Sequence, residues 1–526
     1  MHDPWTAGDL KIVAYFYRRL FIGYTPMPAP IRVFLAAVVV GALVPVQGSA
    51  QGSPYIPLDD PRLPLLEHLI ARGDIEDPSP MIRPFRRADA ARVLAAADSA
   101  GASRFVHTLR EQFEDPPDQN SWRVGIRAGA QAFSHIRRDV LHPLGPDGVR
   151  PYADLTGEAT FGPFALVSRP AAEPRIVDDP EWPGRHDLTL AWRMVEAYAS
   201  AQFKYGSVFY GQMDRNWGPV GISGIGLSNY GYSEVESGFD LGTRTLRLHT
   251  LARQLRDEDS LGNRVHRYFF AHRLGVRFSD KLNLGVWETV VLAGVDRQFD
   301  GRFRNPLSLL LLADQFGLGL DGNVVAGLDA SWRPTRRLTL ETQLGLDDLQ
   351  YEQTSGPQRY PNRWALTVSA YGPLGKSLGW RALYTQASSL AFRTIDPFEN
   401  LTDAGVGIGR NFDDQDQTTL TVTVPRGTFW LFTPELTLLR QGEGRINDPF
   451  PSQAEAGSVP QIFIGVVERT WRVALGISGR QGPLDVAANA GFHHVVNADH
   501  IEGHTVNRFE GRLQATLGIG RRGILQ

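Results

Sequence analysis

Residues 338–346 read Leu-Thr-Leu-Glu-Thr-Gln-Leu-Gly-Leu, and this stretch decides the fold. Leucine occupies positions 338, 340, 344 and 346, while Thr339, Glu341, Gln343 and Gly345 lie between them. Side chains of a β-strand point alternately to opposite faces, so this segment has one apolar side and one polar side. The pattern predicts a strand that separates an apolar environment from a wet one.

The same alternation recurs along most of the chain. It is clear over residues 419–424, 471–478 and 512–519. We expect further strands near residues 122–134, 156–168, 188–200, 202–212, 244–254, 267–278, 281–293, 323–333, 363–372, 379–388, 404–411, 428–440, 461–470 and 484–494. Together these segments predict an all-β fold, an antiparallel outer-membrane β-barrel of about 18 strands.

Composition agrees with a barrel and excludes several other classes. The 526 residues are 42% hydrophobic, which is too polar for a bundle of membrane-spanning helices but suits strands that are only half apolar. With no cysteine, the chain has neither a disulfide framework nor thiolate metal sites. Its formal charge of −3 provides no basic field, so nucleic acid is not an expected partner.

The beginning of the chain has the pattern of a secretory signal. Arg32 precedes an apolar run over residues 33–46, and the small residues 48–50 offer a cleavage site near Ala50. The run is shorter than the ~20 residues that a spanning helix needs, which favours a signal peptide over an uncleaved anchor. We assign residues 1–50 to this signal. Met27 lies just before the run, so translation starts at Met1 or at Met27.

Residues 51–118 follow a helical pattern instead. Three short apolar stripes have helical spacing, and the proline-rich residues 115–118 close the region. The stripes are Leu65, Leu66, Leu69 and Ile70; Ala90, Val93, Leu94 and Ala97; and Phe105, Val106, Leu109 and Phe113. We expect a small periplasmic helical bundle at one mouth of the barrel, with residues 119–526 forming the transmembrane barrel.

The lengths of the connections predict which rim faces outward. Short turns near residues 279–281, 333–335 and 372–375 suit the periplasmic rim, and the longer polar links suit the outer rim. Glu288 is an exception to the strand pattern, because it shares the parity of Leu284 and Val286 and would face lipid unless a bulge intervenes. The competing architecture is a soluble, secreted β-sandwich or propeller.

No pattern of residues indicates catalysis, a cofactor or a metal centre. His493 and His494 are adjacent, so a strand sends them to opposite faces. Asp413, Asp414 and Asp416 form either a calcium-binding loop or, more simply, a solvated acidic turn. We therefore expect that the protein is not an enzyme.

Residues 209–232 combine aromatic, amide and charged side chains with many glycines. Carbohydrate recognition uses this mixture, because a flat ring stacks on a sugar face while carboxylate, amide and guanidinium groups bond its hydroxyls. The candidate polysaccharide-binding residues are Asp214, Arg215, Asn216 and Trp217, with Tyr210 and Gln212 secondary. The alternative interpretation is a structural loop folded into the barrel lumen, where glycine permits positive φ.

At this stretch the chain resembles the capsule-assembly family of outer-membrane proteins, the Wzi type. The resemblance rests on residues 210–219 with 227–229, on 272–275 with 278, 284–285 and 288–291, and on 305–307 with 321–323 and 327–329. It implies a barrel of about 18 strands with a periplasmic helical bundle. It also implies a lectin, without enzymatic activity or cofactor, that helps to retain or assemble capsular or other surface polysaccharide. Outer-membrane lipid and an export-machinery partner are the other expected contacts.

Two functions from different classes remain open on the sequence. The first is the outer-membrane lectin. The second is a porin or solute channel, in which inward arginines such as Arg193, Arg247, Arg273 and Arg277 would set anion preference. A lumen filled by a loop favours the lectin, and an open lumen favours the channel. A barrel lipase or protease is a third possibility, but it lacks a recognisable nucleophile and base.

Overall fold

The computed structural model describes residues 51–99, 104–113, 120–134, 141, 147–299, 322–348 and 360–525. The expected signal peptide lies outside these residues. The described residues belong to a single compact unit, Gly48–Gln526.

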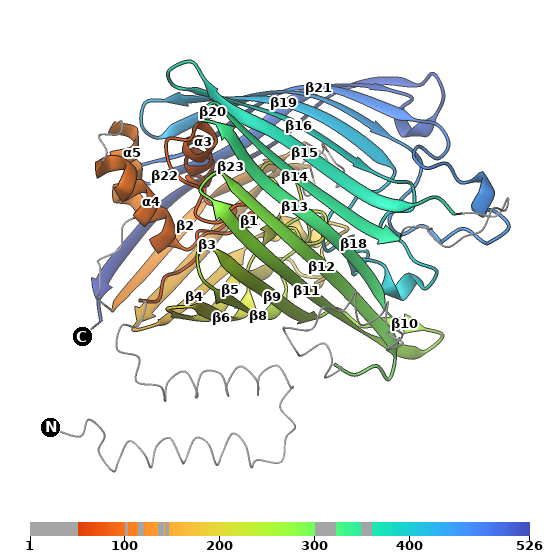
Figure 1. The fold of residues 1–526 in the computed structure, drawn as a ribbon, viewed down its shortest axis with the longest axis horizontal. Coiled ribbons are helices and arrows are strands. Elements are labelled where there is room, and N and C mark those ends of the chain that lie inside the picture. Colours follow the sequence, from red (N-terminus) through yellow and green to blue (C-terminus); the bar gives the residue numbers. More distant parts are fainter. Residues whose placement is uncertain are drawn as a thin grey trace, which may run out of the picture. The chain divides into compact units, whose positions relative to one another are not determined.

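Eighteen antiparallel strands form a closed barrel (Figure 1). Each strand pairs with the next in the chain, and the last strand pairs with the first to close the sheet. The barrel strands are β2 (Ser121–Phe133), β3 (Gly148–Phe161), β4 (Phe164–Ala172), β5 (Trp192–Phe203), β6 (Gly206–Gln212), β8 (Val235–Gly242), β9 (Leu246–Gln254), β11 (Asn263–Ser279), β12 (Leu282–Val295), β13 (Asn323–Thr335), β14 (Leu338–Asp348), β15 (Arg363–Leu374), β16 (Leu378–Ala387), β19 (Gln415–Arg426), β20 (Trp430–Gln441), β21 (Glu468–Gln481), β22 (Leu484–Val496) and β23 (Thr505–Ile524).

Short additional elements lie in the connections between these strands. They are β1 (Ile82–Arg83), β7 (Asn216–Trp217), β10 (Glu258–Ser260), β17 (Thr402–Asp403) and β18 (Val406–Gly407), with the 3-10 turns η1 (Pro174–Asp178), η2 (Pro397–Glu399), η3 (Ala456–Ser458) and η4 (Ala498–His500).

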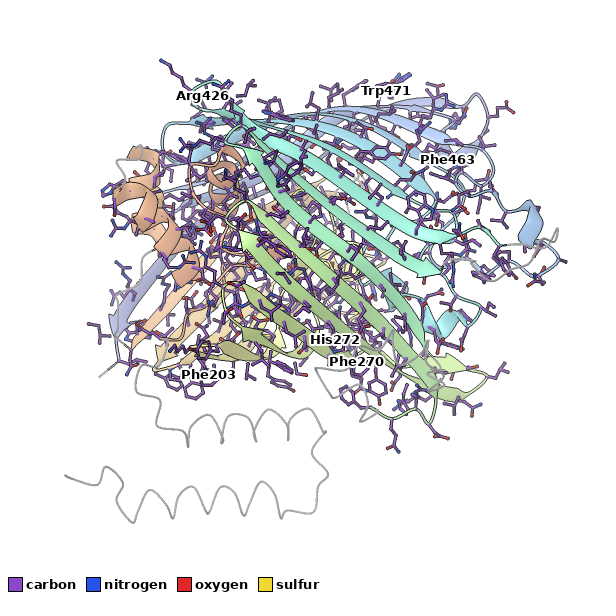
Figure 2. All side chains as sticks on the ribbon, viewed as in Figure 1. Phe203, Phe270, His272, Arg426, Phe463 and Trp471 are labelled. Atoms are coloured by element: carbon purple, nitrogen blue, oxygen red, sulfur yellow. The ribbon has the colours of Figure 1, made fainter. Side chains whose placement is uncertain are left out.

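The two faces of the wall differ as the alternation predicts. On the outer face Leu420 lies opposite Leu436, and both side chains are 47% exposed. On the inner face Thr419 lies opposite Thr437, and their hydroxyls are 2.9 Å apart. Trp471, labelled in Figure 2, is half exposed on the apolar side of β21. The apolar face of the wall therefore contacts the hydrocarbon of the membrane, and the polar face lines the lumen.

A closed sheet pairs every backbone group along its spanning part, which is what a bilayer requires of a strand protein. The protein is accordingly an outer-membrane barrel. Among the described residues no helix combines the length and apolarity needed to cross a membrane.

Three of the expected strands are wrong in detail. Residues 156–168 span two strands, β3 and β4, because the two-residue turn between Phe161 and Phe164 hardly interrupts the alternation. Residues 404–411 contain only the two-residue strand β18, which pairs with β17 and is not part of the wall. Residues 461–470 are mostly loop, since β21 begins at Glu468. The strand β8 was not expected.

The three expected helices are confirmed as α3 (Leu63–Arg72), α4 (Arg87–Ser99) and α5 (Arg104–Phe113). Gly73 ends α3 in the left-handed conformation at φ 76°, where its amide reaches back to Ile70. The bundle docks at the rim of short turns: His68 Nδ1 lies 2.7 Å from Thr423 Oγ1, and Arg72 donates to the carbonyl of Leu378 at 2.6 Å. That this rim is periplasmic stays a prediction, and we call the opposite rim, where the long loops lie, the outer rim.

The lumen is filled by a plug. We use this word for residues 213–228, which fold inward from the outer end of β6. Their strand β7 pairs with β1 of the N-terminal region, with Trp217 opposite Ile82. The amide of Gly218 also donates to the carbonyl of Met81 at 2.8 Å. An N-terminal segment and an inward loop thus meet inside the barrel, as the lumen-loop interpretation predicts.

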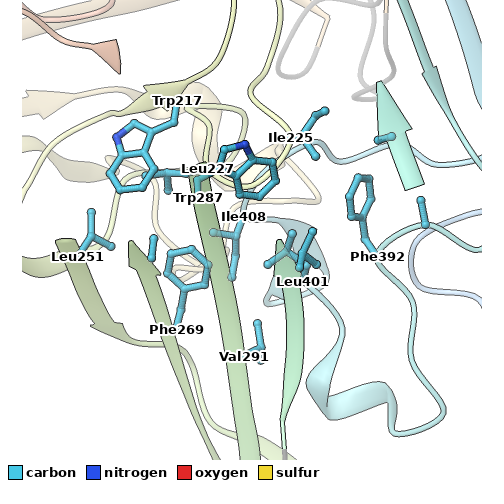
Figure 3. Close-up of a cluster of buried hydrophobic side chains, with 14 of the residues drawn as sticks. Trp217, Ile225, Leu227, Leu251, Phe269, Trp287, Val291, Phe392, Leu401 and Ile408 are labelled. Carbon is cyan, nitrogen blue, oxygen red and sulfur yellow. The ribbon is translucent and has the colours of Figure 1, made fainter. Parts of the chain in front are cut away.

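An apolar core fixes the plug to the wall (Figure 3). Trp217, Ile225 and Leu227 pack with wall residues such as Phe269 and with residues of the loop before β19. The full set is Ile82, Trp217, Ile225, Leu227, Leu251, Leu255, Phe269, Ala271, Trp287, Val291, Val325, Ala365, Ala387, Ala391, Phe392, Leu401, Ile408 and Ile446. A barrel of this size therefore contains a dry core where a channel would contain water.

The unusual carboxylate of Glu288 is accommodated without a bulge. Its register with His272 is regular, and both residues share the outward parity of Val286. The carboxylate lies 2.9 Å from His272 Nδ1, and both side chains are buried. The neighbouring strand thus provides the partner that the carboxylate needs on this face.

The acidic residues before β19 are not a solvated turn. Asp414 is fully buried and accepts from the backbone amides of Gly444, Phe463 and Ile464 at 3.0, 2.5 and 2.9 Å. The carboxylate joins two outer loops by satisfying amides that would otherwise be orphaned. The opposite orientation of His493 and His494 is confirmed, since only His493 is buried.

Candidate functional site

A narrow crevice lies above the plug at the outer rim. Its walls come from the loop before β5, the end of the plug, the ends of β8 and β9, and the β17–β18 hairpin. Its volume is about 40 Å³. This is room for a few water molecules, or for one substituent of a sugar ring rather than the whole ring.

The lining of the crevice is rich in hydrogen-bonding groups of both charges. Its polar residues are Glu181, Asp214, Arg215, Ser228, Tyr232, Ser233, Glu234, Glu236, Arg253, Arg256 and Asp403. Most are already engaged: Arg256 binds Glu234 at 2.7 Å, and the Tyr232 hydroxyl donates to Asp179 at 2.5 Å. Such contacts hold the lining in place before any ligand arrives.

Arg253 on β9 is an exception. It is 9% exposed, lies with its guanidinium 5.1 Å from the centre of the Phe269 ring, and makes no hydrogen bond or ion pair with the described residues. A buried cation without a hydrogen-bonding partner costs free energy. A polar ligand in the crevice would recover that cost.

Asp214 is the second exception. Its carboxylate lines the crevice and has no hydrogen bond or ion pair within the described part of the chain. Burial raises the pKa of Asp214 to about 6, and Arg193 opposes this effect only partly. The crevice therefore contains one acceptor and one cation that make no hydrogen bond or ion pair with the described residues, and both are suited to the hydroxyls of a saccharide.

Three of the candidate residues mainly build the plug. Arg215 pairs with Glu236 and lies 4.4 Å from the centre of the Phe209 ring. Asn216 Oδ1 accepts from the amide of Gly224 at 2.7 Å. Trp217 is 5% exposed within the lumen core. Of the three, only Arg215 also lines the crevice.

The two secondary candidates are not brought to the crevice. Tyr210 lies opposite Ala199 on β5, which in turn lies opposite Leu166, so the register places Tyr210 on the outer face of the wall. Gln212 donates to the carbonyls of Met194 and Ser233, both at 2.8 Å, and so fixes the point where the chain turns inward.

Sequence reasoning missed Tyr232, Glu236, Arg253 and Arg256. They lie on or beside the consecutive strands β8 and β9, and only the folded barrel brings them against Glu181 and Asp403 from distant loops. The run of aromatic residues around Tyr232 was visible in the sequence. Nothing in the sequence distinguishes Arg253 from the many arginines that have partners.

Comparisons with known proteins support the fold. No protein-family model and no curated protein matches the sequence. Among solved structures the chain is similar to Wzi of Escherichia coli, described as an outer-membrane protein involved in group 1 capsule assembly and a carbohydrate-binding β-barrel. The identity is 13%, the match covers 90% of this chain and 99% of Wzi, and the TM-score is 0.60.

Weaker matches are OprD of Pseudomonas aeruginosa and OccAB4 of Acinetobacter baumannii. OprD has 10% identity, 76% and 95% coverage of the two chains, and a TM-score of 0.41. OccAB4 has 8% identity, 78% and 100% coverage, and a TM-score of 0.42. What the fold defines is an outer-membrane β-barrel, and this chain shares the barrel architecture of Wzi.

Proposed function

We propose that this protein is a lectin-like barrel that binds capsular or other surface polysaccharide at the outer face of the outer membrane and helps to retain or assemble it. The observation that carries the proposal is the crevice above the plug, where Asp214 and Arg253 make no hydrogen bond or ion pair within the described part of the chain. The shared architecture with a carbohydrate-binding barrel adds support.

The filled lumen supports this proposal over a porin or solute channel. A channel needs a continuous aqueous path, whereas Trp217, Ile225 and Leu227 pack against the wall in a dry core. Of the four arginines expected in the lumen, Arg273 is neutralised by Asp329 through two bonds of 2.7 and 2.6 Å. Arg193 is similarly bonded to Glu173 at 2.6 Å.

The chemistry of the crevice suits a polyhydroxylated ligand. The Asp214 carboxylate accepts hydrogen bonds from sugar hydroxyls, and the Arg253 guanidinium donates to hydroxyl or carboxylate oxygens. Because the crevice is small, we expect it to hold one substituent while the rest of the saccharide lies across the outer loops. Aromatic pairs among these loops, such as Trp182 with Tyr232 at 4.7 Å between ring centres, offer apolar faces.

The test is binding of surface polysaccharide, purified from the organism that carries the gene, to detergent-solubilised protein. Asp214→Asn and Arg253→Gln each remove one of the two charges that the crevice offers to a ligand. Each contributes a charge-assisted bond of about 1.5–3 kcal/mol, so each variant should bind roughly tenfold to a hundredfold more weakly.

The matched control is Arg264→Gln. The Arg264 side chain is 74% exposed on β11, and it lies away from the crevice lining. Its substitution should leave binding within twofold of the unmodified protein. Equal binding by all three variants would exclude the crevice, and no binding by the unmodified protein would exclude the lectin.

The proposal also specifies what the protein contacts in the membrane. The outer-membrane lipid surrounds the wall, and the polysaccharide is the ligand at the outer rim. Contact between the helical bundle and an export-machinery partner stays a prediction.

A further inference from the structure

A second cavity lies on the other side of the plug, at the periplasmic end. It has a volume of about 330 Å³, which is within the range of small-ligand pockets. Its walls are the N-terminal segment around residues 78–92 and the inner faces of β8, β9 and β11. Arg92 and Arg244 at its rim have side chains that are 58% and 60% exposed, so the cavity opens toward the periplasm.

Arginines dominate the charged lining of this cavity. They are Arg86, Arg92, Arg215, Arg244, Arg247, Arg273 and Arg277, whereas the acidic lining residues are Asp89 and Asp240. Carboxylates in and behind the lining neutralise most of these arginines. Arg273 binds Asp329, Arg277 binds Glu76 at 2.6 Å, and Asp240 lies 2.6 Å from His249 Nδ1.

Arg247 on β9 has no such partner. Its side chain makes no hydrogen bond or ion pair with any described residue, and its Nε is buried and unsatisfied. The residues directly opposite Arg247 on the two adjacent strands are Gly275 and Gly242, which have no side chain to bond its guanidinium. The Asp240 carboxylate on β8 interacts with Arg247 electrostatically, but its bond goes to His249. A Cβ at Gly275 would come within 2.8 Å of Arg273 Nη1, so this glycine keeps the wall open for the second arginine.

We propose that this cavity is a binding site for an oxyanion, a carboxylate or phosphate carried by a small solute that enters from the periplasm. Arg247 is the residue that binds it directly, with Arg273 and His249 beside it. A guanidinium offers several N–H groups in a fixed fork that matches these anions. Arg215 lines both this cavity and the outer crevice. The two sites are nevertheless distinct, because Arg247 and Arg253 lie six residues apart on β9, roughly 20 Å, with the plug core at Leu251 between them.

The experiment is calorimetric titration of the full-length protein in detergent at low salt. The probes are inorganic phosphate, glucuronate and glucose 1-phosphate, with glucose as the uncharged comparison. The proposal expects at least one charged probe to bind and glucose not to bind. Tighter binding of glucuronate or glucose 1-phosphate than of phosphate supports an acidic saccharide as the source of the anion, and equal binding supports the free anion.

Variants of two arginines test the site. Arg247→Gln should weaken anion binding roughly tenfold to a hundredfold, Arg247→Lys should retain part of it, and the exposed-arginine control Arg264→Gln should leave it within twofold. Absence of binding by the unmodified protein, or an Arg247→Gln variant that binds as well as the parent, would overturn the proposal. Neither result bears on polysaccharide binding at the outer rim, which depends on Asp214 and Arg253.

Discussion

Replacing Trp217 with alanine is expected to release the plug while the barrel wall stays closed. The indole is 5% exposed and packs in the lumen core, where its removal leaves a cavity. Truncation of a buried tryptophan to alanine costs about 3–5 kcal/mol. Burial of ~150–250 Å² at ~25 cal/mol per Å² gives a similar figure. The wall does not share this loss, because its strands are paired along their whole length.

The loss should appear as local opening of the plug. Since about 1.4 kcal/mol is a factor of ten in an equilibrium constant, the open fraction should rise roughly 10²- to 10³-fold. Hydrogen exchange measured by mass spectrometry reports this opening at the amides of Trp217, Gly218 and Ile225. These amides donate to Leu227, Met81 and Gln343 at 3.0, 2.8 and 3.0 Å. Their exchange should accelerate by that factor, while exchange in β20–β22 stays unchanged.

Trp471→Ala is the matched control, because that indole is half exposed on the outer face of the wall. It should leave plug exchange unaltered. If Trp217→Ala changed plug exchange by less than about fivefold, the apolar core would not hold the plug. The anchoring would then belong to polar contacts such as those of Gln343 and Arg410.

Three other perturbations follow from the same contacts. Polysaccharide binding should weaken roughly tenfold from pH 7 to pH 5, because the Asp214 carboxylate, with a pKa of about 6, becomes protonated over this range and is then a poorer acceptor. Because burial raises the pKa of Asp214 from 3.8 to about 6, the protonated carboxyl stabilises the fold; this contribution is fully present below about pH 3.8 and is lost as pH rises through 6. Polysaccharide binding and the free energy of unfolding, titrated in parallel, should therefore change in opposite directions with pH. Burial lowers the pKa of His68 to about 4, so docking of α3 should weaken as pH falls from 6.5 toward 4, by up to roughly 3 kcal/mol. Limited proteolysis of α3 at pH 7 and pH 4.5 measures this, and equal cleavage rates would contradict it. Gly409→Ala should loosen the plug, since a Cβ there would lie 2.0 Å from the Ile225 carbonyl oxygen. Gly231→Ala meets only an ordinary 3.5 Å contact and should not, with hydrogen exchange as the measurement.

The alternation of apolar and polar residues predicts the strands of the wall, because neighbouring residues face lipid and lumen in turn, and lipid requires apolar side chains whereas the lumen accepts polar ones. Leu338 and Leu340 on β14 obey that demand, and so do Leu420 and Val422 on β19. The expected number of strands is right although some assignments are wrong. Merging β3 with β4 and omitting β8 offset the two extra strands placed in outer loops.

The errors have a physical cause. Alternation shows that a segment has two unlike faces, but it does not show whether the apolar face meets hydrocarbon or another part of the chain. Residues 404–411 contain the turn of the β17–β18 hairpin, the two-residue strand β18 and further glycines, and Gly409 packs directly against the plug. The sequence cannot distinguish this from a wall strand.

The candidate site was predictable in part for a related reason. The mixture of residues around Asp214 and Arg215 was visible, and both line the crevice. Trp217 and Asn216 belong to the same motif, yet they stabilise the plug. Arg253 makes no hydrogen bond or ion pair with the described residues because of what β8 and β11 present beside it, and this is a property of the assembled barrel.

The most direct test of the closed lumen is single-channel recording of the purified, unmodified protein in planar bilayers. The plugged barrel should insert without conducting, and the Trp217→Ala variant, measured under the same conditions, should show discrete openings. Steady ohmic steps from the unmodified protein would contradict the account, because they require a water-filled path where the structure has a packed apolar core.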